Sequence, residues 1–382
     1  MSDLTIGSLR CHVVDTGGGR TWLFVEMTGS DGTVGWGEAS QNRNDPAVVH
    51  EVERLAHLYV GHHPLDLIER RQALARWAYE GKSLCAAVSA IEQACWDLAG
   101  RRLGEPVFRL LGGAAQEAVR AYANISLAAA DATPAAQAEA ARAAVAAGFG
   151  AVKLNFGFRP RGPAGSREIG AWMEGCLAKV VAVREAVGPG IDLLVDLVHQ
   201  LADLKEALAV ARALERFDLF WLEDPFPRDE PELLAEFRRS VGPRVAGGAQ
   251  LLHREEFRAL LEARALDVIM PDVKWCGGIL ELRKLAAQAE LHGVTVSPHN
   301  FSGPVSAAAS VHAAMTMPNL LILEYCFGRP TWRDALACGT ERVEAGMFPR
   351  PSRPGLGIDL DPALLAGHAL VGPASDIRGV AL

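Results

Sequence analysis

The sequence predicts an α/β chain in which a small α+β region precedes a closed barrel of eight parallel strands. The length of 382 residues suits two or three domains. Residues 1–118 place strand-like runs before helices, whereas strands and helices alternate strictly from Val119 onwards. Hydrophobic residues make up 49% and charged residues 22% of the chain, an ordinary globular composition that argues against disorder.

The first region begins with runs that alternate between apolar and polar residues. Three of them are expected to form strands: Leu9–Val14, Thr21–Thr28 and Val34–Glu38. Helical periodicity takes over from about Ala47. Its clearest example, Ser83–Arg102, ends before Gly104 and Pro106, which are residues that stop helices. We therefore expect a small α+β domain over residues 1–118.

From Val119 the chain repeats a unit of one strand and one helix. The expected strands are Arg120–Ile125, Ala151–Asn155, Asp192–Asp196, Leu219–Glu223, Arg244–Gly247, Val268–Pro271, Thr295–Ser297 and Leu320–Glu324. The expected helices between them are 133–147, 167–187, 203–216, 230–240, 254–264, 278–292 and 303–317. Repeated βα units predict a parallel sheet, and eight of them predict a closed barrel. The barrel is expected over 119–330, and the segment 331–382 is expected to pack back on the first domain.

Charge and composition exclude several classes of partner. The formal net charge of −8 argues against a nucleic-acid footprint spread over the surface. No run of about 18 apolar residues is present, so no membrane span is expected. Met1–Arg10 lacks the pattern of a secretory signal, and the seven cysteines show no C-x-x-C spacing. We expect a cytoplasmic protein with a small-molecule partner, and no nucleic-acid or membrane partner.

Polar and charged residues gather where the barrel strands end, which is where barrel enzymes carry their chemistry. The residues at these ends are Lys153, Asn155, Asp196, Glu223, Asp272, His299 and Glu324. Side chains alternate along a strand, so Lys153 and Asn155 are both expected to face the barrel mouth. A single Asp after a strand is more often a helix cap than a ligand. Such an accumulation at one end of one barrel predicts an active site.

Asp196 and Glu223 end neighbouring strands, the third and the fourth. Buried like charges cost free energy unless a metal ion or a counter-charge neutralises them. Carboxylate oxygens are the ligands that Mg²⁺ prefers in proteins. The pair therefore predicts a magnesium site.

Asp272 and His299 end the sixth and seventh strands, which are also neighbours. A carboxylate that accepts a hydrogen bond from one imidazole nitrogen fixes the tautomer and raises the basicity of the other nitrogen. The pair therefore predicts a general base. Lys274 lies two residues after Asp272 on the same face, and it is expected to add positive charge beside the substrate.

Short motifs occur in order on the expected elements: Gly35-Trp36-Gly37-Glu38, Ala90-Ile91-Glu92-Gln93-Ala94-Cys95-Trp96-Asp97, Leu110-Leu111-Gly112-Gly113, Val152-Lys153-Leu154, Trp221-Leu222-Glu223-Asp224-Pro225, Pro271-Asp272-Val273, Gly277-Gly278, Ser297-Pro298-His299-Asn300 and Pro354-Gly355-Leu356-Gly357. Together they resemble the mandelate racemase-like branch of the enolase superfamily over essentially the whole chain. The resemblance implies an α+β capping domain, completed by the C-terminal tail, over a modified TIM barrel, (β/α)₇β. It also implies a carboxylate substrate bound by Mg²⁺ and a base that removes its α-proton. We further expect a homo-oligomer.

The resemblance assigns roles to individual residues. It makes Asp196 and Glu223 metal ligands, Asp272 and His299 the catalytic dyad, Glu324 the acid that ends the last strand, and Lys153 the first lysine of a Lys-x-Lys pair. Trp22 and Asn42 fall in capping-domain loops that close the barrel mouth in relatives, so they are expected to contact the substrate, with Asn155 and Lys274.

Two positions depart from the family pattern. Ala249 stands where the third metal-binding carboxylate is expected, which predicts weak binding of Mg²⁺. Asn155 replaces the second lysine, so His299 is left as the base for carbon chemistry. One base favours abstraction of the α-proton followed by loss of a β-hydroxyl, the reaction of an acid-sugar dehydratase (a hydro-lyase). The alternatives are a cycloisomerase, a one-base epimerase, or a non-catalytic barrel that has lost its metal.

Overall fold

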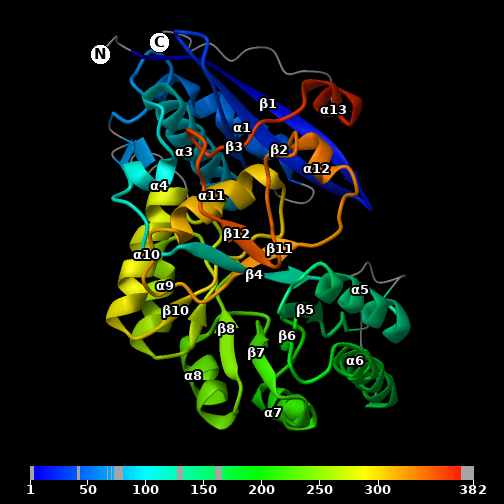
Figure 1. The fold of residues 1–382 in the computed structure, drawn as a ribbon. Coiled ribbons are helices and arrows are strands. Elements are labelled where there is room, and N and C mark those ends of the chain that lie inside the picture. The colour runs from blue at the N-terminus through cyan, green and yellow to red at the C-terminus, as the bar shows by residue number, and fades with distance from the viewer. Residues whose placement is uncertain are drawn as a thin grey trace.

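The computed structural model describes residues 4–40, 44–66, 68–69, 71–72, 81–126, 132–159 and 166–370. Figure 1 shows a body of strands and helices from the first part of the chain lying against one end of a larger body, with the C-terminal end of the chain, in red, beside the first body. The first body contains an antiparallel sheet in the order β1 (Ile6–Gly17), β2 (Arg20–Gly29) and β3 (Val34–Glu38). Its helices are α1 (Asp45–Leu55), η1 (Ala56–Leu58), α3 (Lys82–Leu103) and α4 (Val107–Leu110). This α+β arrangement confirms the expected capping domain.

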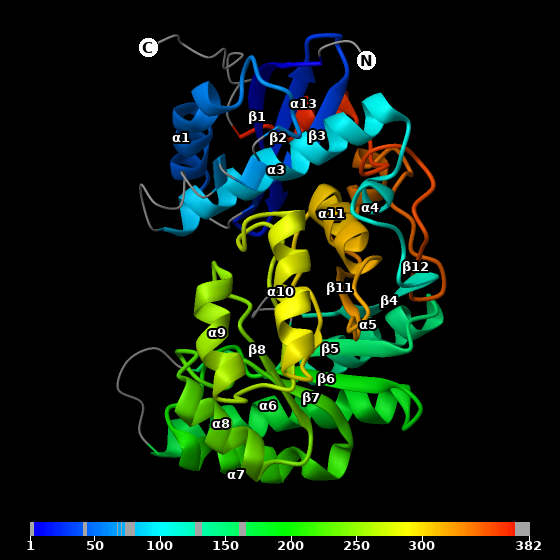
Figure 2. The same ribbon diagram turned by 90° about the vertical axis from the view of Figure 1, so that its left-hand side faces the viewer.

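Strand β3 lies directly against helix α3, as Figure 2 shows. The contact requires glycine, because a Cβ atom on Gly37 would lie 1.8 Å from the carbonyl oxygen of Ala90. A residue with any side chain would therefore separate the strand from the helix. Glu38, the last residue of the strand, is thereby held at the edge that faces the barrel.

The second body is a barrel of parallel strands. Its strands are β4 (Ala118–Asn124), β5 (Ala151–Asn155), β6 (Asp192–Asp196), β7 (Leu219–Glu223), β8 (Arg244–Gly247), β9 (Val268–Ile269), β10 (Thr295–Val296) and β11 (Leu323–Cys326). They pair in the order β10-β9-β8-β7-β6-β5-β4-β11. A parallel bridge between Val296 and Leu320 joins the two ends of this sheet. The predicted barrel is confirmed.

Helices alternate with these strands and cover the outside of the barrel. They are α5 (Pro134–Ala146), α6 (Ser166–Val187), α7 (Leu204–Leu214) with η2 (Glu215–Phe217), α8 (Pro231–Ser240), α9 (Arg254–Glu262), α10 (Ile279–Leu291) and α11 (Pro304–Ala314). The order of elements in the described residues is that of a (β/α)₇β barrel. Among the described residues, no helix combines the length and the apolar character that crossing a bilayer requires.

The later barrel strands differ in length from the expected ones. Strands β9 and β10 stop at Ile269 and Val296, just before the segments that contain Pro271 and Pro298. Proline has no backbone N–H to donate, so it shortens a ladder. Strand β11 starts at Leu323 instead of Leu320. These differences leave the strand ends, and the polar residues on them, at the same rim of the barrel.

Buried side chains fill the barrel below that rim. Tyr122 of β4 and Trp221 of β7 are both fully buried, and their rings meet edge to face with centroids 5.4 Å apart. Leu194 and Met270 belong to the same cluster of buried residues. The interior of the barrel is therefore packed with side chains, which close it below the end where the strands terminate.

Two buried glutamates tie the capping domain to the barrel by binding the beginnings of barrel helices. Glu38 accepts hydrogen bonds from the backbone N–H groups of Gly303 (2.7 Å) and Ser306 (2.8 Å) at the start of α11. Glu92 of α3 accepts from Ile279 (2.8 Å) and Leu280 (3.0 Å) at the start of α10. Helix N-termini favour negative charge, so both contacts fix the cap over the mouth.

The C-terminal segment contacts both bodies. It contains α12 (Arg333–Leu336), β12 (Met347–Pro349) and α13 (Pro362–Gly367). Strand β12 pairs antiparallel with β4 of the barrel. Further on, the carbonyl oxygen of His368 accepts from the N–H of Asp15 in β1 at 2.9 Å. The tail thus reaches the capping sheet after first adding a strand to the barrel, and the boundaries at residues 118 and 330 stay predictions.

Candidate active site

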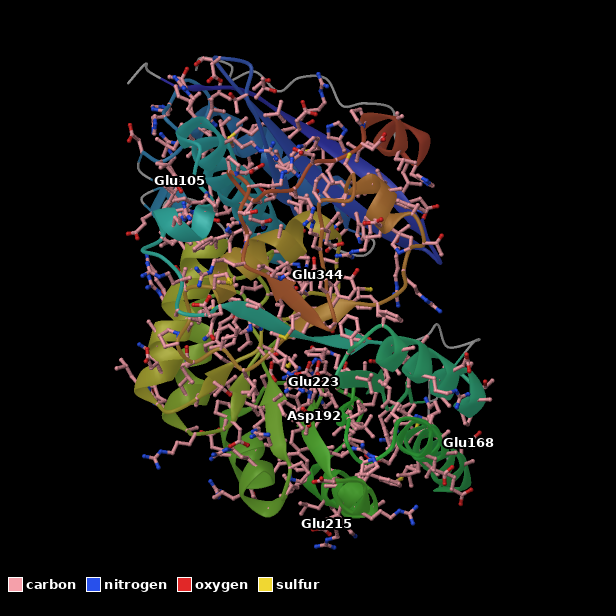
Figure 3. The ribbon with its side chains drawn as sticks, in the orientation of Figure 1. Glu105, Glu168, Asp192, Glu215, Glu223 and Glu344 are labelled. Atoms are coloured by element: carbon pink, nitrogen blue, oxygen red, sulfur yellow. The ribbon has the colours of Figure 1, made fainter. Side chains whose placement is uncertain are left out.

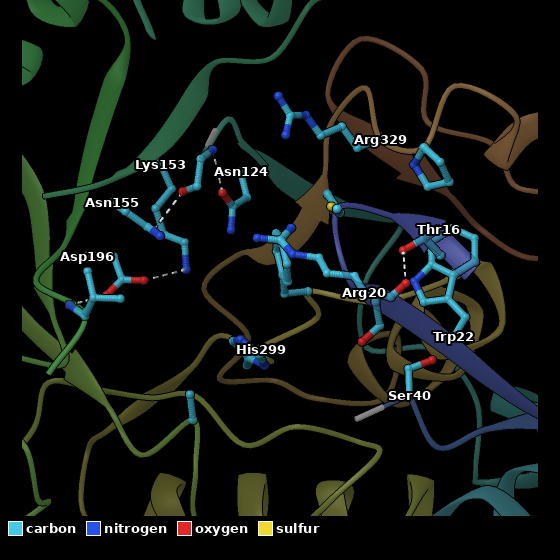
Figure 4. Close-up of a pocket in the computed structure, with 18 of the residues that line it drawn as sticks. Thr16, Arg20, Trp22, Ser40, Asn124, Lys153, Asn155, Asp196, His299 and Arg329 are labelled. Carbon is cyan, nitrogen blue, oxygen red and sulfur yellow. Dashed lines mark hydrogen bonds and ion pairs between the residues drawn. The ribbon is translucent and has the colours of Figure 1, made fainter. Parts of the chain in front are cut away.

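A cavity of about 720 Å³ lies at the carboxyl ends of the barrel strands. Its walls come from the strand ends on one side and from the tip of the β1–β2 hairpin and the loop after β11 on the other. Figure 4 shows Lys153, Asn155 and Asp196 at one end of this cavity, with Trp22 at the other. Both parts of the chain therefore contribute to one site.

Lys153 is the centre of the charged cluster at the barrel end. Its side chain is 1% exposed, and its Nζ lies 2.6 Å from Glu223 Oε1, 2.9 Å from Glu324 Oε1 and 3.8 Å from Asp196 Oδ2. Burial alone would lower the pKa of this ammonium, but Glu223 and Glu324 raise it well above its ordinary value. Lys153 is therefore held as a cation.

Glu223 is fully buried at the centre of the barrel, whereas Glu168 and Glu215 lie on its periphery (Figure 3). Burial raises the pKa of the Glu223 carboxyl well above its ordinary value, and the nearby Asp196 and Asp224 carboxyls add to this effect. The contact with Lys153 opposes it. The single positive charge of Lys153 therefore does not balance the negative charges of Asp196, Glu223 and Asp224.

Asp224 joins the two expected metal ligands. One carboxylate oxygen from each of Asp196, Glu223 and Asp224 lies within 4.8 Å of the others. Asp224 is 5% exposed, and its Oδ1 has no hydrogen-bond partner. Ala249 lines the cavity with no carboxylate, as its sequence dictates. The third acid therefore comes from the residue that follows strand β7 and not from the segment after β8 that holds Ala249.

Strand alternation misses Asp224, because a residue adjacent to Glu223 belongs to the opposite face. The backbone at Asp224 has φ of 43°, which turns its side chain out of the strand pattern. Asp is one of the residues that tolerate this left-handed conformation. Gly247 of β8 also leaves room, since a Cβ atom there would lie 3.1 Å from Asp224 Oδ1. Local pattern alone carries no signal for either effect.

His199 is a second residue that the strand-end pattern does not select. Its Nδ1 lies 2.8 Å from the carbonyl oxygen of Phe226, and its Nε2 lies 3.1 Å from Asp224 Oδ2. Burial would lower the pKa of the imidazole, but the contact with Asp224 raises it to about 10. His199 is therefore a cation that holds Asp224 in place.

The predicted base and its partner are in contact. His299 Nδ1 lies 2.7 Å from Asp272 Oδ2, and His299 Nε2 lies 3.7 Å from Glu324 Oε2. Burial would raise the pKa of Asp272, but Lys274 and His299 lower it to about 2. His299 lines the cavity and stacks on Trp275, with ring centroids 5.6 Å apart and planes at 29°. The orientation of the imidazole is therefore fixed by Asp272 at Nδ1 and by Trp275 on one ring face.

Glu324 is fully buried between the lysine and the histidine. It accepts hydrogen bonds from Asn124 Nδ2 at 2.7 Å and from the backbone N–H of Asn300 at 2.8 Å. Burial would raise the pKa of this carboxyl, but Lys153 and His299 lower it to about 2. Glu324 is therefore an anion that links the two sides of the site.

The residues expected to contact the substrate have different outcomes. Asn155 and Trp22 line the cavity, and Asn155 Oδ1 accepts from Ser126 Oγ at 2.7 Å. Trp22 does so from strand β2 and not from a loop as expected. Asn42 lies outside the described residues. Lys274 is 1% exposed, and its Nζ donates to Asp272 Oδ2 at 2.6 Å. Its position behind Asp272 favours an electrostatic role over contact with the substrate.

A barrel that brings together a cluster of carboxylates, a buried lysine and a histidine–aspartate pair around one capped cavity defines an acid–base enzyme. Family profiles agree with this class. The profile described as "Mandelate racemase / muconate lactonizing enzyme, N-terminal domain" matches residues 11–112, and "Enolase C-terminal domain-like" matches residues 135–364. The chain belongs to the enolase superfamily, in its mandelate racemase and muconate lactonizing enzyme group.

Individual relatives cover nearly the whole chain. A D-galactonate dehydratase family member of Streptomyces bingchenggensis is 32% identical over 93% of this chain and 91% of its own length. A D-xylonate dehydratase of Haloferax volcanii is 32% identical over 97% of this chain and 90% of its own length. The crystal structure of a mandelate racemase/muconate lactonizing enzyme from Sulfitobacter sp. is 31% identical, with a TM-score of 0.87 over 97% of this chain and 96% of its own.

Proposed function

We propose that the protein is an acid-sugar dehydratase, a hydro-lyase that removes the α-proton of a hydroxylated carboxylate and eliminates water. The observation that carries the proposal is the placement of His299 across one cavity from Lys153 and the carboxylate cluster. Similarity to the D-galactonate and D-xylonate dehydratases over most of the chain supports it.

The donor set fits Mg²⁺. Asp196, Glu223 and Asp224 supply hard oxygen ligands that lie close together. Asp224 Oδ1 is buried without a hydrogen-bond partner, and a bound cation would compensate the cost of burying it. These three residues would hold the ion. When bound, Mg²⁺ would neutralise negative charge that develops on the substrate carboxylate as the α-proton leaves.

Lys153 would bind the same end of the substrate. Its ammonium is already oriented by Glu223 and Glu324, so it reaches the ligand without reorganisation. A fixed positive charge in a buried site stabilises an enolate more strongly than water does. Lys153 therefore orients the carboxylate and stabilises the anion.

His299 would take the α-proton on Nε2, because Nδ1 is already bonded to Asp272. The electron pair of the broken C–H bond forms the C=C bond, and the C–O bond to the β-hydroxyl breaks. His199 Nδ1 lies 2.8 Å from the carbonyl oxygen of Phe226, and its Nε2 faces Asp224 Oδ2 at 3.1 Å without forming a hydrogen bond. We propose that His299 returns its proton to the hydroxyl, which leaves as water.

The residue at position 155 bears on one isomerase reaction, racemisation by two bases. Racemisation by two bases requires a titrating side chain on the other face of the substrate. Asn155 occupies that position, and its amide does not titrate. Dehydration requires one base, as a cycloisomerase or a one-base epimerase would, and similarity to the D-galactonate and D-xylonate dehydratases favours dehydration over both.

The test is a panel of acid sugars assayed with Mg²⁺ for the 2-keto-3-deoxy product, which semicarbazide traps. We expect at least one acid to be converted, and His299→Asn to lower kcat by about 10²- to 10⁴-fold. His292→Asn, on the exposed end of α10, is the matched control and keeps full activity. Normal turnover by His299→Asn would contradict the assignment of the base.

A further inference from the structure

Two arginines lie at the end of the cavity that faces away from the carboxylate cluster. Arg20 begins β2 in the capping sheet, and Arg329 lies in the loop after β11. Figure 4 shows the Arg20 side chain extending into the cavity towards Asn124 and His299, with Arg329 on the same side and Asp196 at the opposite end.

An aromatic ring holds Arg20 in this position. The guanidinium carbon of Arg20 lies 4.5 Å from the centroid of the Phe301 ring. Phe301 lines the cavity two residues after His299. A guanidinium that stacks by its face keeps the N–H groups on its edge free to donate. These donors are available to a ligand that also reaches His299.

In the part of the chain that the structure describes, no carboxylate compensates the positive charges of Arg20 and Arg329. Within the described ranges, neither arginine forms an ion pair with a carboxylate. Burial lowers the pKa of the Arg20 guanidinium, Cys326 opposes this effect, and the neighbouring Arg329 charge adds to it. Two like charges that are partly removed from water cost free energy, which an anion bound between them would offset.

We propose that Arg20 and Arg329 form a subsite for a second carboxylate, at the far end of the substrate from the carboxylate that Lys153 binds. The inference rests on the proposed function and narrows its substrate class. The substrate is an aldarate, a sugar acid with a carboxylate at each end. In an aldonate the far end is a neutral hydroxymethyl group, which leaves the two charges unpaired.

The distribution of charge along the cavity supports this assignment. Lys153 and the cluster of carboxylates lie at one end, His299 lies between, and the two arginines lie at the other end. A volume of about 720 Å³ is ample for an extended acid sugar. Arginine matches the planar geometry of a carboxylate by donating two parallel hydrogen bonds.

Matched acids that differ only at the far end test the subsite: gluconate and glucarate, galactonate and galactarate, and xylonate and xylarate. Calorimetry measures their binding to the Mg²⁺-loaded protein, and the product assay measures their turnover. We expect the wild type to bind an aldarate at least about 10-fold more tightly than its matched aldonate. Arg20→Gln should weaken aldarate binding by about 10- to 100-fold and change aldonate binding little.

Further variants separate charge from structure. Arg20→Lys keeps the charge and should retain most of the aldarate preference, and Arg329→Gln should act in the same direction as Arg20→Gln. Arg142→Gln on the exposed face of α5, where Arg142 pairs with Glu139, is the control and should change nothing. Thermal unfolding of each variant shows that the fold is retained.

The outcomes for the subsite and for the proposed function are distinct. Equal weakening of both members of a pair by Arg20→Gln, a wild-type preference for aldonates, or no binding by any of the acids would overturn the subsite. Arginine-dependent aldarate binding without elimination of water would contradict the dehydratase proposal and leave the subsite intact. Turnover of aldonates that is indifferent to Arg20 would support the dehydratase alone.

Discussion

Lys274 Nζ lies 2.6 Å from Asp272 Oδ2, the same carboxylate oxygen that lies 2.7 Å from His299 Nδ1. The backbone N–H of Lys274 also donates to Asp272 Oδ1 at 2.8 Å. The carboxylate behind the proposed base is therefore shared between an imidazole and a fully buried ammonium. A carboxylate raises the basicity of the histidine it touches, and a neighbouring cation reduces that effect.

The first prediction is that Lys274→Met moves the acid limb of the kcat/KM pH profile to higher pH, by about one unit. Lys274 and His299 together lower the pKa of Asp272 to about 2 in the wild type, and the contact with His299 remains in the variant to favour the anion. Removing the lysine leaves its full negative charge facing His299, which favours the protonated imidazole. Activity then begins at a higher pH.

The other charges near this group stay in place in that variant. Glu324 faces His299 from β11, Lys82 of α3 lies over Trp275, and Glu38 of β3 lies near Lys274. Lys284→Met on α10 removes a lysine that pairs with Glu69 outside the site, and it should leave the profile unchanged. A Lys274→Met profile that superimposes on the wild type would show that the lysine is only structural.

The second prediction concerns the source of the third metal ligand. Asp224→Asn should weaken Mn²⁺ binding, measured by electron paramagnetic resonance, by at least about 10-fold. Ala249→Glu should strengthen it, because it adds a carboxylate at a buried position that lines the same cavity. Asp192→Asn, at the opposite end of β6 from Asp196, is the control and should leave the affinity unchanged. If Asp224→Asn bound the ion as tightly as this control, Asp224 would not be a ligand.

The barrel could be predicted from sequence because its signals are local. Each strand from Ala151–Asn155 to Arg244–Gly247 has the predicted bounds, since a short apolar run between helices is sufficient to define a buried parallel strand. The polar residues that end the strands could be read in the same way. The short β9 and β10 also have a visible cause, the prolines that follow them.

The parts of the site that sequence missed depend on contacts between distant segments. Asp224 reaches the acid cluster through a left-handed backbone and the space beside Gly247, and neither belongs to a periodic pattern. Arg20 lies near the start of the chain and is far in sequence from Phe301 of the barrel, yet its guanidinium lies over the Phe301 ring. Lys274 lies on the same side as Asp272, as expected, but only the structure shows that its ammonium forms an ion pair with the Asp272 carboxylate.

The third prediction concerns stability at low pH. His312 of α11 is fully buried, accepts from the backbone N–H of Phe108 at 3.1 Å, and leaves its Nε2 without a partner. Burial lowers the pKa of this imidazole from 6.5 to about 4. The folded protein therefore keeps it neutral, while the unfolded chain takes up a proton as the pH falls below 6.5. The free energy of unfolding should therefore decrease as the pH falls from 6.5 to about 4.

His312→Gln removes this titration and keeps an acceptor for Phe108. The decrease in the free energy of unfolding between pH 7 and pH 4 should be smaller in the variant, by up to about 3 kcal/mol. Urea unfolding at both pH values measures it. His292→Gln, at an exposed histidine, should lose stability as the wild type does. Parallel losses in all three proteins would mean that His312 is not the group that titrates.

The last prediction concerns stereochemistry at the α-carbon. His299 serves one face of the substrate, and the position that would serve the other holds Asn155, whose Oδ1 accepts from Ser126. The wild type should therefore wash deuterium from D₂O into one α-epimer only, as followed by proton NMR with each epimer incubated separately.

Asn155→Lys introduces an amine beside a cavity that already contains the Lys153 ammonium, and a neighbouring positive charge lowers the pKa of an amine. The new lysine can then act as a second base, so the variant should exchange both epimers slowly. Asn155→Met matches its length without a titrating group and should keep the one-sided pattern. Exchange of both epimers by the wild type would require another base within the cavity, and the argument from Asn155 against racemisation would fail.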